Sequence, residues 1–336
     1  MEFVPLHSIY PKIYKYSISI LISDVYKTSM FMKIEENSKK KTRKSLFYRG
    51  RVIMKKSIFS DEISEDLSEA IDLAVKYDIE ALELRNVWNK SIVEVSTSEL
   101  GEIKARMEES NLSVSCIATF AFKCRYDSDS EFQESMDIIK RGLEAAQFLN
   151  ARVLRVFTFW KPNFEVSLEE LAEKMRPAVE LFRNTNVILG IENGSRTIVG
   201  STRDIGALID IINEPFVGVV WDPGNCLFGE RESDPFPEGY SHIRGKVAHL
   251  HIKDVKVTPE GPRYVELGKG DIDFREILKQ LKRDGYEGYA SIETHWRPNF
   301  HFTRQELDLP YAHISREGYE ASEIYLSKFR EMWPGA

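Results

Sequence analysis

Polar and apolar residues alternate along a short stretch late in the chain, from Val247 to Lys253. His249, His251 and Lys253 share one parity, and the residues between them are apolar. In a β-strand, residues of one parity point to one face. The pattern therefore predicts a strand with one face packed against helices and two imidazoles and an ammonium on the other. A strand that only builds a core has no need of such a face, so we expect a chemical site here, with His251 as a metal ligand.

From residue 55 onward, the hydrophobic pattern predicts strands that alternate with helices. The expected strands cover residues 56–60, 79–84, 112–118, 151–159, 187–192, 216–221, 247–253 and 288–293. The expected helices start near Ser64, read as a capping residue, and then cover 98–110, 130–149, 167–183, 202–212, 274–284 and 311–332. Residues 234–245, rich in Pro and Gly, are predicted to form a weakly structured connection.

Eight strand–helix units over about 280 residues predict an α/β fold with a parallel sheet. The count and length favour a single-domain (β/α)₈ TIM barrel over residues 54–336, since such barrels typically have ~250 residues. The alternative, a doubly wound open sheet, usually has a Gly-rich first turn. The sequence has no such turn.

Composition narrows the class of protein further. The chain has 336 residues, 42% apolar and 29% charged, which is typical of a soluble globular protein. A net charge of -7 argues against nucleic-acid binding, and no apolar run approaches the ~20 residues of a membrane span. Three cysteines without a pairing pattern favour reduced thiols and a cytoplasmic location.

Residues 1–53 differ from the rest in charge. They carry eleven basic and four acidic residues, a net +7, whereas the remainder carries 35 basic and 49 acidic residues, a net -14. The segment lacks helical or strand periodicity, so we expect a poorly ordered basic extension. It is either a basic arm for RNA or a membrane, or a segment upstream of a true translation start at Met54; we favour the start at Met54.

Chemistry in a TIM barrel sits at the carboxyl ends of the strands. Four consecutive predicted strands end there with groups that can bind a metal, in the runs Ile191-Glu192-Asn193, Trp221-Asp222-Pro223-Gly224-Asn225, His249-Leu250-His251-Ile252-Lys253-Asp254 and Ser291-Ile292-Glu293. Each alone is weak, because a charged residue at a strand end is often only solvated. Four in succession, in one register, predict a common site, although parity alone does not choose between His249 and His251.

These runs, together with Leu267-Gly268-Lys269-Gly270-Asp271-Ile272-Asp273-Phe274 and Gly285-Tyr286-Glu287-Gly288, resemble the xylose-isomerase-like sugar (phosphate) isomerase/epimerase family of TIM barrels. The resemblance is clearest over residues 187–296. It implies that Glu192, Asp222, His251 and Glu293 bind one divalent metal. Such an oxygen-rich set suits Mn²⁺, Mg²⁺ or Co²⁺, with Zn²⁺ as a further alternative. It also implies a small-molecule sugar or sugar-phosphate substrate and, as one expectation, a homo-oligomer.

The resemblance also implies a mechanism. A metal that holds adjacent hydroxyl and carbonyl oxygens stabilises an enediolate, and Glu192 and Glu293 serve as acid/base groups on opposite sides of the substrate. Proton return to the same carbon gives epimerisation, and transfer to the next carbon gives isomerisation. Loss of a β-hydroxyl would make the protein a dehydratase of a keto-sugar or keto-inositol. The sequence does not choose between these outcomes.

Several residues around this core are candidates for substrate binding. Asn225 stands where many relatives have His, and His249 lies one step deeper than His251. Lys253 either contacts an anionic substrate or forms an ion pair with Asp222 or Glu293. The remaining candidates lie near other strand ends: Arg85, Lys123, Trp160 and Arg297, with Glu62 as a further rim residue. Arg85 and Lys123 could equally form salt bridges within the loops. For Trp160 a packing role is favoured. Arg155 lies within its strand, where an inward-pointing cation needs a buried partner.

Two rival functions use the same architecture. An apurinic endonuclease of this fold needs a three-metal cluster with histidines from the early strands, and this chain has none between His7 and His242. A non-catalytic sugar-binding barrel would have no need of two opposed glutamates on a metal. A divalent-metal-dependent isomerase or epimerase is therefore the favoured function.

Overall fold

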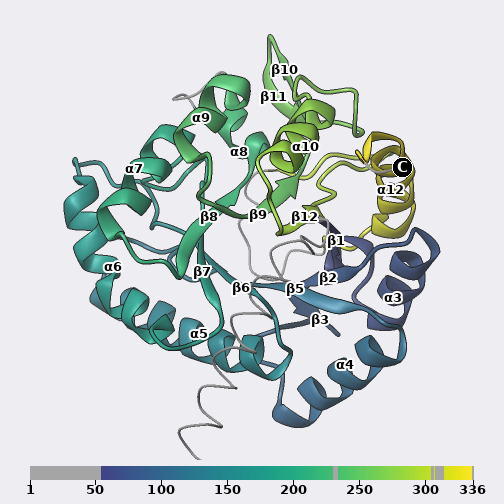
Figure 1. The fold of residues 1–336 in the computed structure, drawn as a ribbon, viewed down its shortest axis with the longest axis horizontal. Coiled ribbons are helices and arrows are strands. Elements are labelled where there is room, and N and C mark those ends of the chain that lie inside the picture. The colour runs from purple at the N-terminus through teal and green to yellow at the C-terminus, as the bar shows by residue number, and fades with distance from the viewer. Residues whose placement is uncertain (1–53, 230–233, 304–305, 307–313, 335–336) are drawn as a thin grey trace, which may run out of the picture. The chain divides into compact units, whose positions relative to one another are not determined.

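The strands of the computed structural model, which describes residues 54–229, 234–303, 306 and 314–334, form a closed parallel barrel (Figure 1). The order around the barrel is β1-β12-β9-β8-β7-β6-β5-β2. The TIM-barrel prediction is confirmed; the basic extension 1–53 lies outside the described residues. The barrel strands are β1 (Lys55–Phe59), β2 (Ala81–Leu84), β5 (Ser113–Ala118), β6 (Val153–Val156), β7 (Ile188–Glu192), β8 (Val217–Trp221), β9 (Val247–Ile252) and β12 (Tyr289–Ile292).

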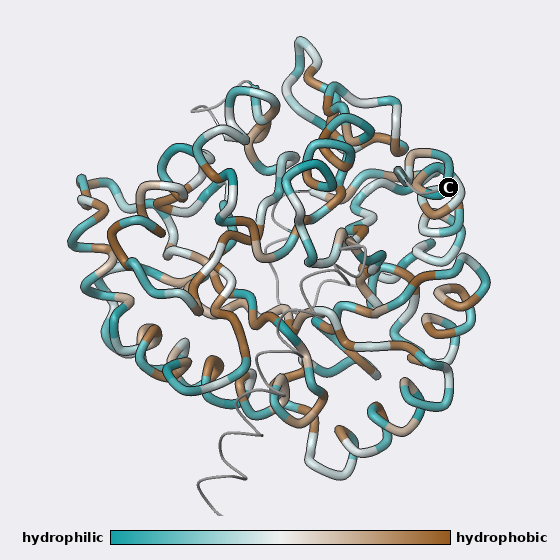
Figure 2. Tube along the Cα trace, in the orientation of Figure 1, coloured by the Kyte–Doolittle hydropathy of each residue, from teal (hydrophilic) through white to brown (hydrophobic). Residues whose placement is uncertain are grey.

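Amphipathic helices surround the barrel, and apolar and polar residues alternate along them (Figure 2). In α6, for example, Leu171, Met175 and Val179 are buried on one stripe. None of the helices in the described part of the chain is long and apolar enough to cross a membrane. The main helices are α3 (Leu67–Lys76), α4 (Thr97–Glu109), α5 (Asp129–Phe148), α6 (Leu168–Phe182), α7 (Thr202–Ile212), α10 (Phe274–Arg283) and α12 (Gly318–Met332).

Shorter elements at the strand ends were not expected from the sequence. They include two hairpins, β3 (Asn86–Val87) with β4 (Lys90–Ser91) and β10 (Val255–Thr258) with β11 (Gly261–Tyr264). The Pro-rich connection contains a short π-type turn, η1 (Pro235–Gly239), and one helical turn, α9 (Tyr240–Ile243). Two further short helices, α2 (Ser60–Ile63) and α8 (Pro223–Phe228), directly follow barrel strands β1 and β8.

Two helix starts differ from the sequence-based prediction. Helix α3 is capped by Asp66, whose side chain accepts from the Ser68 amide, while Ser64 accepts from the Asp66 amide one step earlier. Helix α12 begins at Gly318, whereas part of the expected earlier stretch lies outside the described residues. A Cβ on Gly318 would lie 2.2 Å from the Glu62 carbonyl oxygen, so the helix can approach α2 only with a glycine at this position.

Small residues fill the barrel interior beneath the carboxyl ends of the strands. Cys116, Val153 and Val220 form a separate buried cluster there. Gly190 leaves room for it, since a Cβ at that position would lie 2.6 Å from the Val220 side chain and 2.7 Å from that of Val153. In register with this layer, Glu83 pairs with Cys116 and Val220 pairs with His249. Apolar and polar side chains therefore share this level of the interior, where Glu83 contacts both His249 and His251.

Candidate metal centre and pocket

The barrel closure brings together the four ligands expected from the sequence. Glu192 ends β7, Asp222 follows β8, His251 lies in β9 and Glu293 follows β12. One ligand atom from each lies within 4.8 Å of those of the other three, and all four residues are buried. Because parallel strands end at the same rim, residues far apart in the sequence meet at one point.

Glu192 is held from two sides. Arg155 Nη1 donates to its Oε2 at 2.9 Å, and Asn225 Nδ2 donates to its Oε1 at 3.0 Å. Burial alone would raise the pKa of Glu192, but the charges of Arg155 and His251 outweigh it and lower the pKa to about 2. The buried partner that Arg155 required is thus the glutamate itself, and Glu192 is a carboxylate at neutral pH.

Glu293 is likewise held from two sides, in its case by two cations. Arg85 Nη1 donates to its Oε1 at 3.2 Å, and Lys253 Nζ donates to its Oε2 at 2.7 Å. Burial acts to raise the pKa of Glu293, yet Lys253 and His295 hold it well below its ordinary value. Both glutamates are therefore ionised and fixed in orientation by residues from neighbouring strands.

Lys253 also pairs with Asp222, with Nζ 2.7 Å from Oδ2. The ion-pair alternative for Lys253 is thus the arrangement seen, with both carboxylates at once. Burial raises the pKa of Asp222, and repulsion from Glu293 and Glu192 adds to that effect and outweighs the attraction of Lys253. Burial would lower the pKa of Lys253, but Asp222 and Glu293 hold it well above its ordinary value. The ammonium is therefore charged and lies between two of the four ligands.

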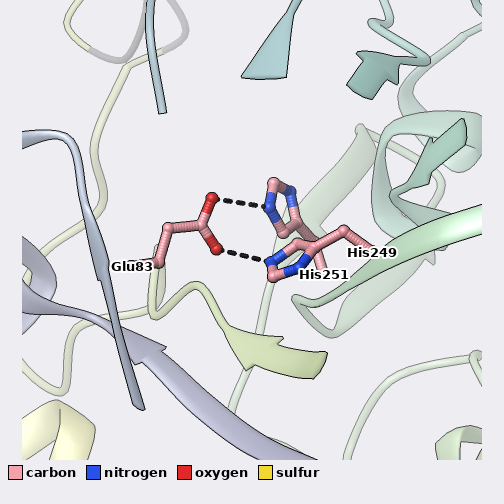
Figure 3. A group of neighbouring side chains, drawn as sticks. All are labelled: Glu83, His249 and His251. Carbon is pink, nitrogen blue, oxygen red and sulfur yellow. Dashed lines mark hydrogen bonds and ion pairs between the residues drawn. The ribbon is translucent and has the colours of Figure 1, made fainter. Parts of the chain in front are cut away.

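A carboxylate that the sequence reasoning missed supports the two histidines. Glu83, in β2, faces both imidazoles (Figure 3), with one oxygen 2.8 Å from His249 Nε2 and the other 3.2 Å from His251 Nε2. Burial would raise the pKa of Glu83, but His251 and His249 hold it well below its ordinary value, so the carboxylate only accepts hydrogen bonds. Both Nε2 atoms must then carry hydrogen. In the neutral imidazole of His251 this leaves the lone pair on Nδ1.

The Nδ1 atom of His251 faces the other ligands. It lies 3.6 Å from Glu192 Oε1 and 3.9 Å from Glu293 Oε2, and it is buried without a hydrogen-bond partner among the described residues. Asp222 Oδ2 likewise has no hydrogen bond there, although it contacts the Lys253 ammonium. Burial would lower the pKa of His251, but Glu83 and Glu192 raise it to about 10, because negative charge predominates. An unpaired buried Nδ1 beside carboxylates of a negative site fits a bound cation.

The balance of buried charges agrees with a divalent cation. The ligand group and its supporting networks contain six buried carboxylates and four buried cations. If the histidines are neutral, a divalent cation would balance the excess negative charge. The carboxylates are Asp61, Glu62, Glu83, Glu192, Asp222 and Glu293, and the cations are Arg85, Arg155, Lys253 and Arg297. A further buried carboxylate, that of Asp254, accepts instead from the backbone amides of Gly268 and Gly270.

A second buried network supports Glu293 from the β1 side. His295 Nδ1 lies 2.8 Å from Glu62 Oε1, and its Nε2 lies 3.5 Å from Glu293 Oε1. Arg85 joins the same network through Asp61, with Nε 2.8 Å from Oδ2. The network fixes both the guanidinium and the imidazole that contact Glu293.

Arg297 takes a different place from the one expected. Its guanidinium is buried and bonded to Glu62 and to the backbone carbonyls of Ile314 and Arg316, and it does not line the pocket. Its position ties the segment after β12 to α2, because those carbonyls need a donor once they are buried. Glu62, expected at the rim, is fully buried in the same contact.

A pocket of about 620 Å³, including its open mouth, leads to these ligands. Of the sequence-predicted substrate residues, Arg85, Lys123, Trp160, Asn225 and Lys253 line it. His249 is fully buried and does not line it. The sequence reasoning missed further lining residues, among them Phe120, Phe157, Arg196, Tyr264 and His295.

One missed residue had a signal in the sequence. Glu83 lies between Leu82 and Leu84 in an expected strand, so the alternation places its charge on the face opposite to these two leucines. For Arg196 and Tyr264 no comparable signal exists, because both lie outside the barrel strands, Tyr264 at the end of hairpin β10–β11 and Arg196 in the loop after β7.

Two relatives share part of the sequence. A 3-oxo-isoapionate decarboxylase from Pectobacterium atrosepticum is 28% identical over 169 residues, which cover 48% of this chain and 58% of that protein. An inosose dehydratase from Clostridium perfringens is 26% identical over 149 residues, which cover 40% of this chain and 49% of that protein. The chain thus spans about half the length of the relatives it matches.

Solved structures match over more of the chain. A D-allulose 3-epimerase from Methylomonas sp. has a TM-score of 0.64 at 13% identity, covering 83% of this chain and 98% of that one. The IOLI protein with a bound zinc atom has a TM-score of 0.64 at 17% identity, with the same coverage of 83% and 98%. At such identities the likeness shows the fold.

The family comparison covers most of the barrel. The model described as "Xylose isomerase-like TIM barrel" matches residues 71–320, a range that contains Glu83 and all four residues of the metal-ligand group. Together with the closed eight-stranded barrel, this match establishes that the chain belongs to the xylose isomerase-like TIM barrel family.

Proposed function

We propose that the protein is a divalent-metal-dependent isomerase or epimerase that acts on a sugar or sugar phosphate. The observation that carries the proposal is the pair of ionised glutamates, Glu192 and Glu293, which come from different strands into one ligand group and are each fixed by their own cation. The D-allulose 3-epimerase of the same fold supports this reading.

Glu192, Asp222, His251 through Nδ1, and Glu293 would hold the metal. Oxygen ligands with one imidazole suit Mn²⁺, Mg²⁺ or Co²⁺, and Zn²⁺ is compatible as well. A divalent ion, when bound, would supply the positive charge that polarises a substrate carbonyl and acidifies the neighbouring C–H bond.

The proton transfer itself belongs to the glutamates. Each is a carboxylate at neutral pH, so each can accept a proton from the acidified carbon. Arg155 and Asn225 keep Glu192 in one orientation, and Arg85 does the same for Glu293. If one glutamate removes the proton and the other, after taking up a proton from water, delivers it to the same carbon on the opposite side, the product is the epimer. Transfer of the proton to the adjacent carbon gives the aldose–ketose pair.

Lys253 contributes positive charge beside the reacting oxygens. Its ammonium already contacts Asp222 and Glu293 at 2.7 Å and lines the pocket. A fixed cation at this position stabilises the negative charge that develops on a substrate oxygen when the proton leaves.

A dehydratase is the second candidate, favoured by the inosose dehydratase among the relatives. The same proton removal followed by loss of a β-hydroxyl as water would give it. The two reactions share the first step and differ in whether water leaves.

Deuterium exchange tests both. The full chain is incubated in D₂O with Mn²⁺ and a panel of ketoses, ketose phosphates and keto-inositols, and NMR follows exchange, epimer formation and loss of water. Glu192→Gln and Glu293→Gln should each slow exchange by about 10²–10⁴-fold. Glu80→Gln, a carboxylate just before β2 that contacts the Lys56 amide, should leave it unchanged. Exchange by the glutamine variants at the parent rate would refute the assignment, and dehydration without epimer or isomer would favour the dehydratase.

A further inference from the structure

His295, which follows β12, is 6% exposed and yet lines the pocket. Its backbone amide donates to the Glu293 carbonyl at 3.0 Å, so a tight turn brings its side chain close to that of Glu293. The Tyr264 ring packs edge-to-face on the imidazole, with the ring centroids 5.1 Å apart. The imidazole is therefore held in place beside one of the two proposed acid/base groups.

Glu62 determines which ring nitrogen of His295 carries hydrogen. Arg85 Nη2 donates to Glu62 Oε1 at 3.1 Å and Arg297 Nη2 donates to Oε2 at 3.3 Å, so two guanidiniums keep this buried carboxylate ionised. An ionised carboxylate only accepts hydrogen bonds. Because His295 Nδ1 lies 2.8 Å from Glu62 Oε1, Nδ1 must carry the hydrogen, and in the neutral imidazole the lone pair is on Nε2.

The Nε2 atom of His295 faces Glu293 without bonding to it. It lies 3.5 Å from Glu293 Oε1, which is longer than an ordinary hydrogen bond, and among the described residues no group donates a hydrogen bond to it. Two acceptors, the Nε2 lone pair and Glu293 Oε1, thus lie next to each other at the pocket. A hydroxyl group of a ligand would supply the donor that Nε2 lacks and add no charge.

A second metal ion would be the other possible occupant, because Glu62, Glu293 and His295 are close enough to form a ligand group. Two guanidiniums already bind these carboxylates, however. Arg85 contacts both glutamates, at 3.1 and 3.2 Å, and Arg297 contacts Glu62 at 3.3 Å. A dication placed beside two fixed cations would be repelled by both, so the contacts favour a neutral hydroxyl.

We propose that His295 is a substrate-binding residue, and that its Nε2 accepts a hydrogen bond from a sugar hydroxyl on a carbon next to the one that Glu293 serves. This inference rests on the proposed function and narrows its substrate class to sugars with a free hydroxyl at that carbon. A deoxy sugar would leave the Nε2 lone pair buried without a donor, and such a loss discriminates strongly between ligands.

Nitrogen NMR of the imidazole tests the proposal without relying on turnover. The full chain is labelled with ¹⁵N-histidine and loaded with Mg²⁺, and the His295 signals are identified by their absence from the spectra of His295→Asn or His295→Gln. Ribitol, xylitol and D-arabinitol are then titrated in. The comparison ligand is 1,5-pentanediol, which has the same carbon chain without the three inner hydroxyls.

We expect Nε2 to carry no hydrogen, and at least one pentitol to shift its signal in the direction of an accepted hydrogen bond, whereas 1,5-pentanediol at the same concentration does not. His295→Asn keeps an N–H group that can donate to Glu62 but has no atom in the place of Nε2. It should lose about three- to tenfold in affinity for that pentitol and keep the Mn²⁺ affinity of the parent, measured by chelator competition. His242→Asn is the matched control and should bind as the parent does, because His242 lies in α9, ahead of β9, and does not line the pocket.

Four results would overturn the assignment of His295: a hydrogen on Nε2, no pentitol that shifts its signal, unchanged pentitol affinity in His295→Asn, or a loss that only parallels a loss of Mn²⁺ affinity. Deuterium exchange is measured on the same samples. Exchange without an effect at His295 retains the proposed function alone, and a pentitol bound to His295 without exchange on any sugar retains the binding role alone.

Discussion

Replacement of Glu83 by glutamine tests the link between the barrel interior and the metal site. The carboxylate is fully buried and accepts from His249 and His251 at 2.8 and 3.2 Å. Glutamine has nearly the same shape, but one of its two oxygens becomes an NH₂ donor. One imidazole must then present a lone pair at Nε2 and move its hydrogen to Nδ1. If that imidazole is His251, its Nδ1 can no longer bind a metal.

The size of the effect follows from this geometry. Outer carboxylates that orient a ligating histidine typically change metal affinity by about 10–100-fold, which corresponds to roughly 1.4–2.8 kcal/mol. We expect Glu83→Gln to weaken Mn²⁺ binding within this range even though it touches no ligand carboxylate. Competition with a chromophoric chelator measures the affinity directly, at constant pH and ionic strength.

Two controls make the result decisive. Glu80→Gln alters a partly exposed carboxylate just before the same strand and should leave Mn²⁺ affinity unchanged. Circular dichroism and urea unfolding in the presence of a chelator establish that each variant is folded before metal is added. A folded Glu83→Gln protein that binds Mn²⁺ within about twofold of the parent would refute the orienting role of Glu83.

Three further outcomes are expected. Arg155→Met leaves Glu192 buried without its cation and should lower the free energy of unfolding by about 3–5 kcal/mol, measured in urea, with recovery in the Arg155→Met/Glu192→Gln double variant. The pKa of Glu62 is lowered to about 2 in the fold, chiefly by His295 against the effect of burial; its contribution to stability should be complete above its ordinary pKa of 4.5 and disappear as the pH falls from 4.5 through 2. Parallel acid unfolding of the parent and Glu62→Gln would show this as a smaller loss of stability in the variant. Mn²⁺ at about 100 times its dissociation constant should stabilise the protein by about 2.7 kcal/mol, and a thermal shift that persists in Asp222→Asn at the same concentration would contradict the assignment of that ligand.

Hydrophobic periodicity by itself determined the architecture. Each barrel strand is buried on both faces, whereas each helix is buried on one. The spacing of the apolar residues therefore identified strands and helices locally, for example the strand segments that end at Glu192 and Glu293. Because all parallel strands end at one rim, strand-end position alone was enough to predict that Glu192, Asp222 and Glu293 lie together with a histidine from β9. The choice of His251 over His249 needed the family resemblance as well.

The tertiary structure alone decided which groups those ligands contact. Arg155 meets Glu192, Lys253 joins Asp222 to Glu293, and Glu83 fixes both histidines, because side chains of different strands share one layer inside the closed barrel. Local patterns do not encode such contacts, which depend on the stagger between strands. The same is true of Arg196, whose place beside Trp160 depends on how two loops pair, through the bridge between Trp160 and Thr197, and on no periodicity along the chain.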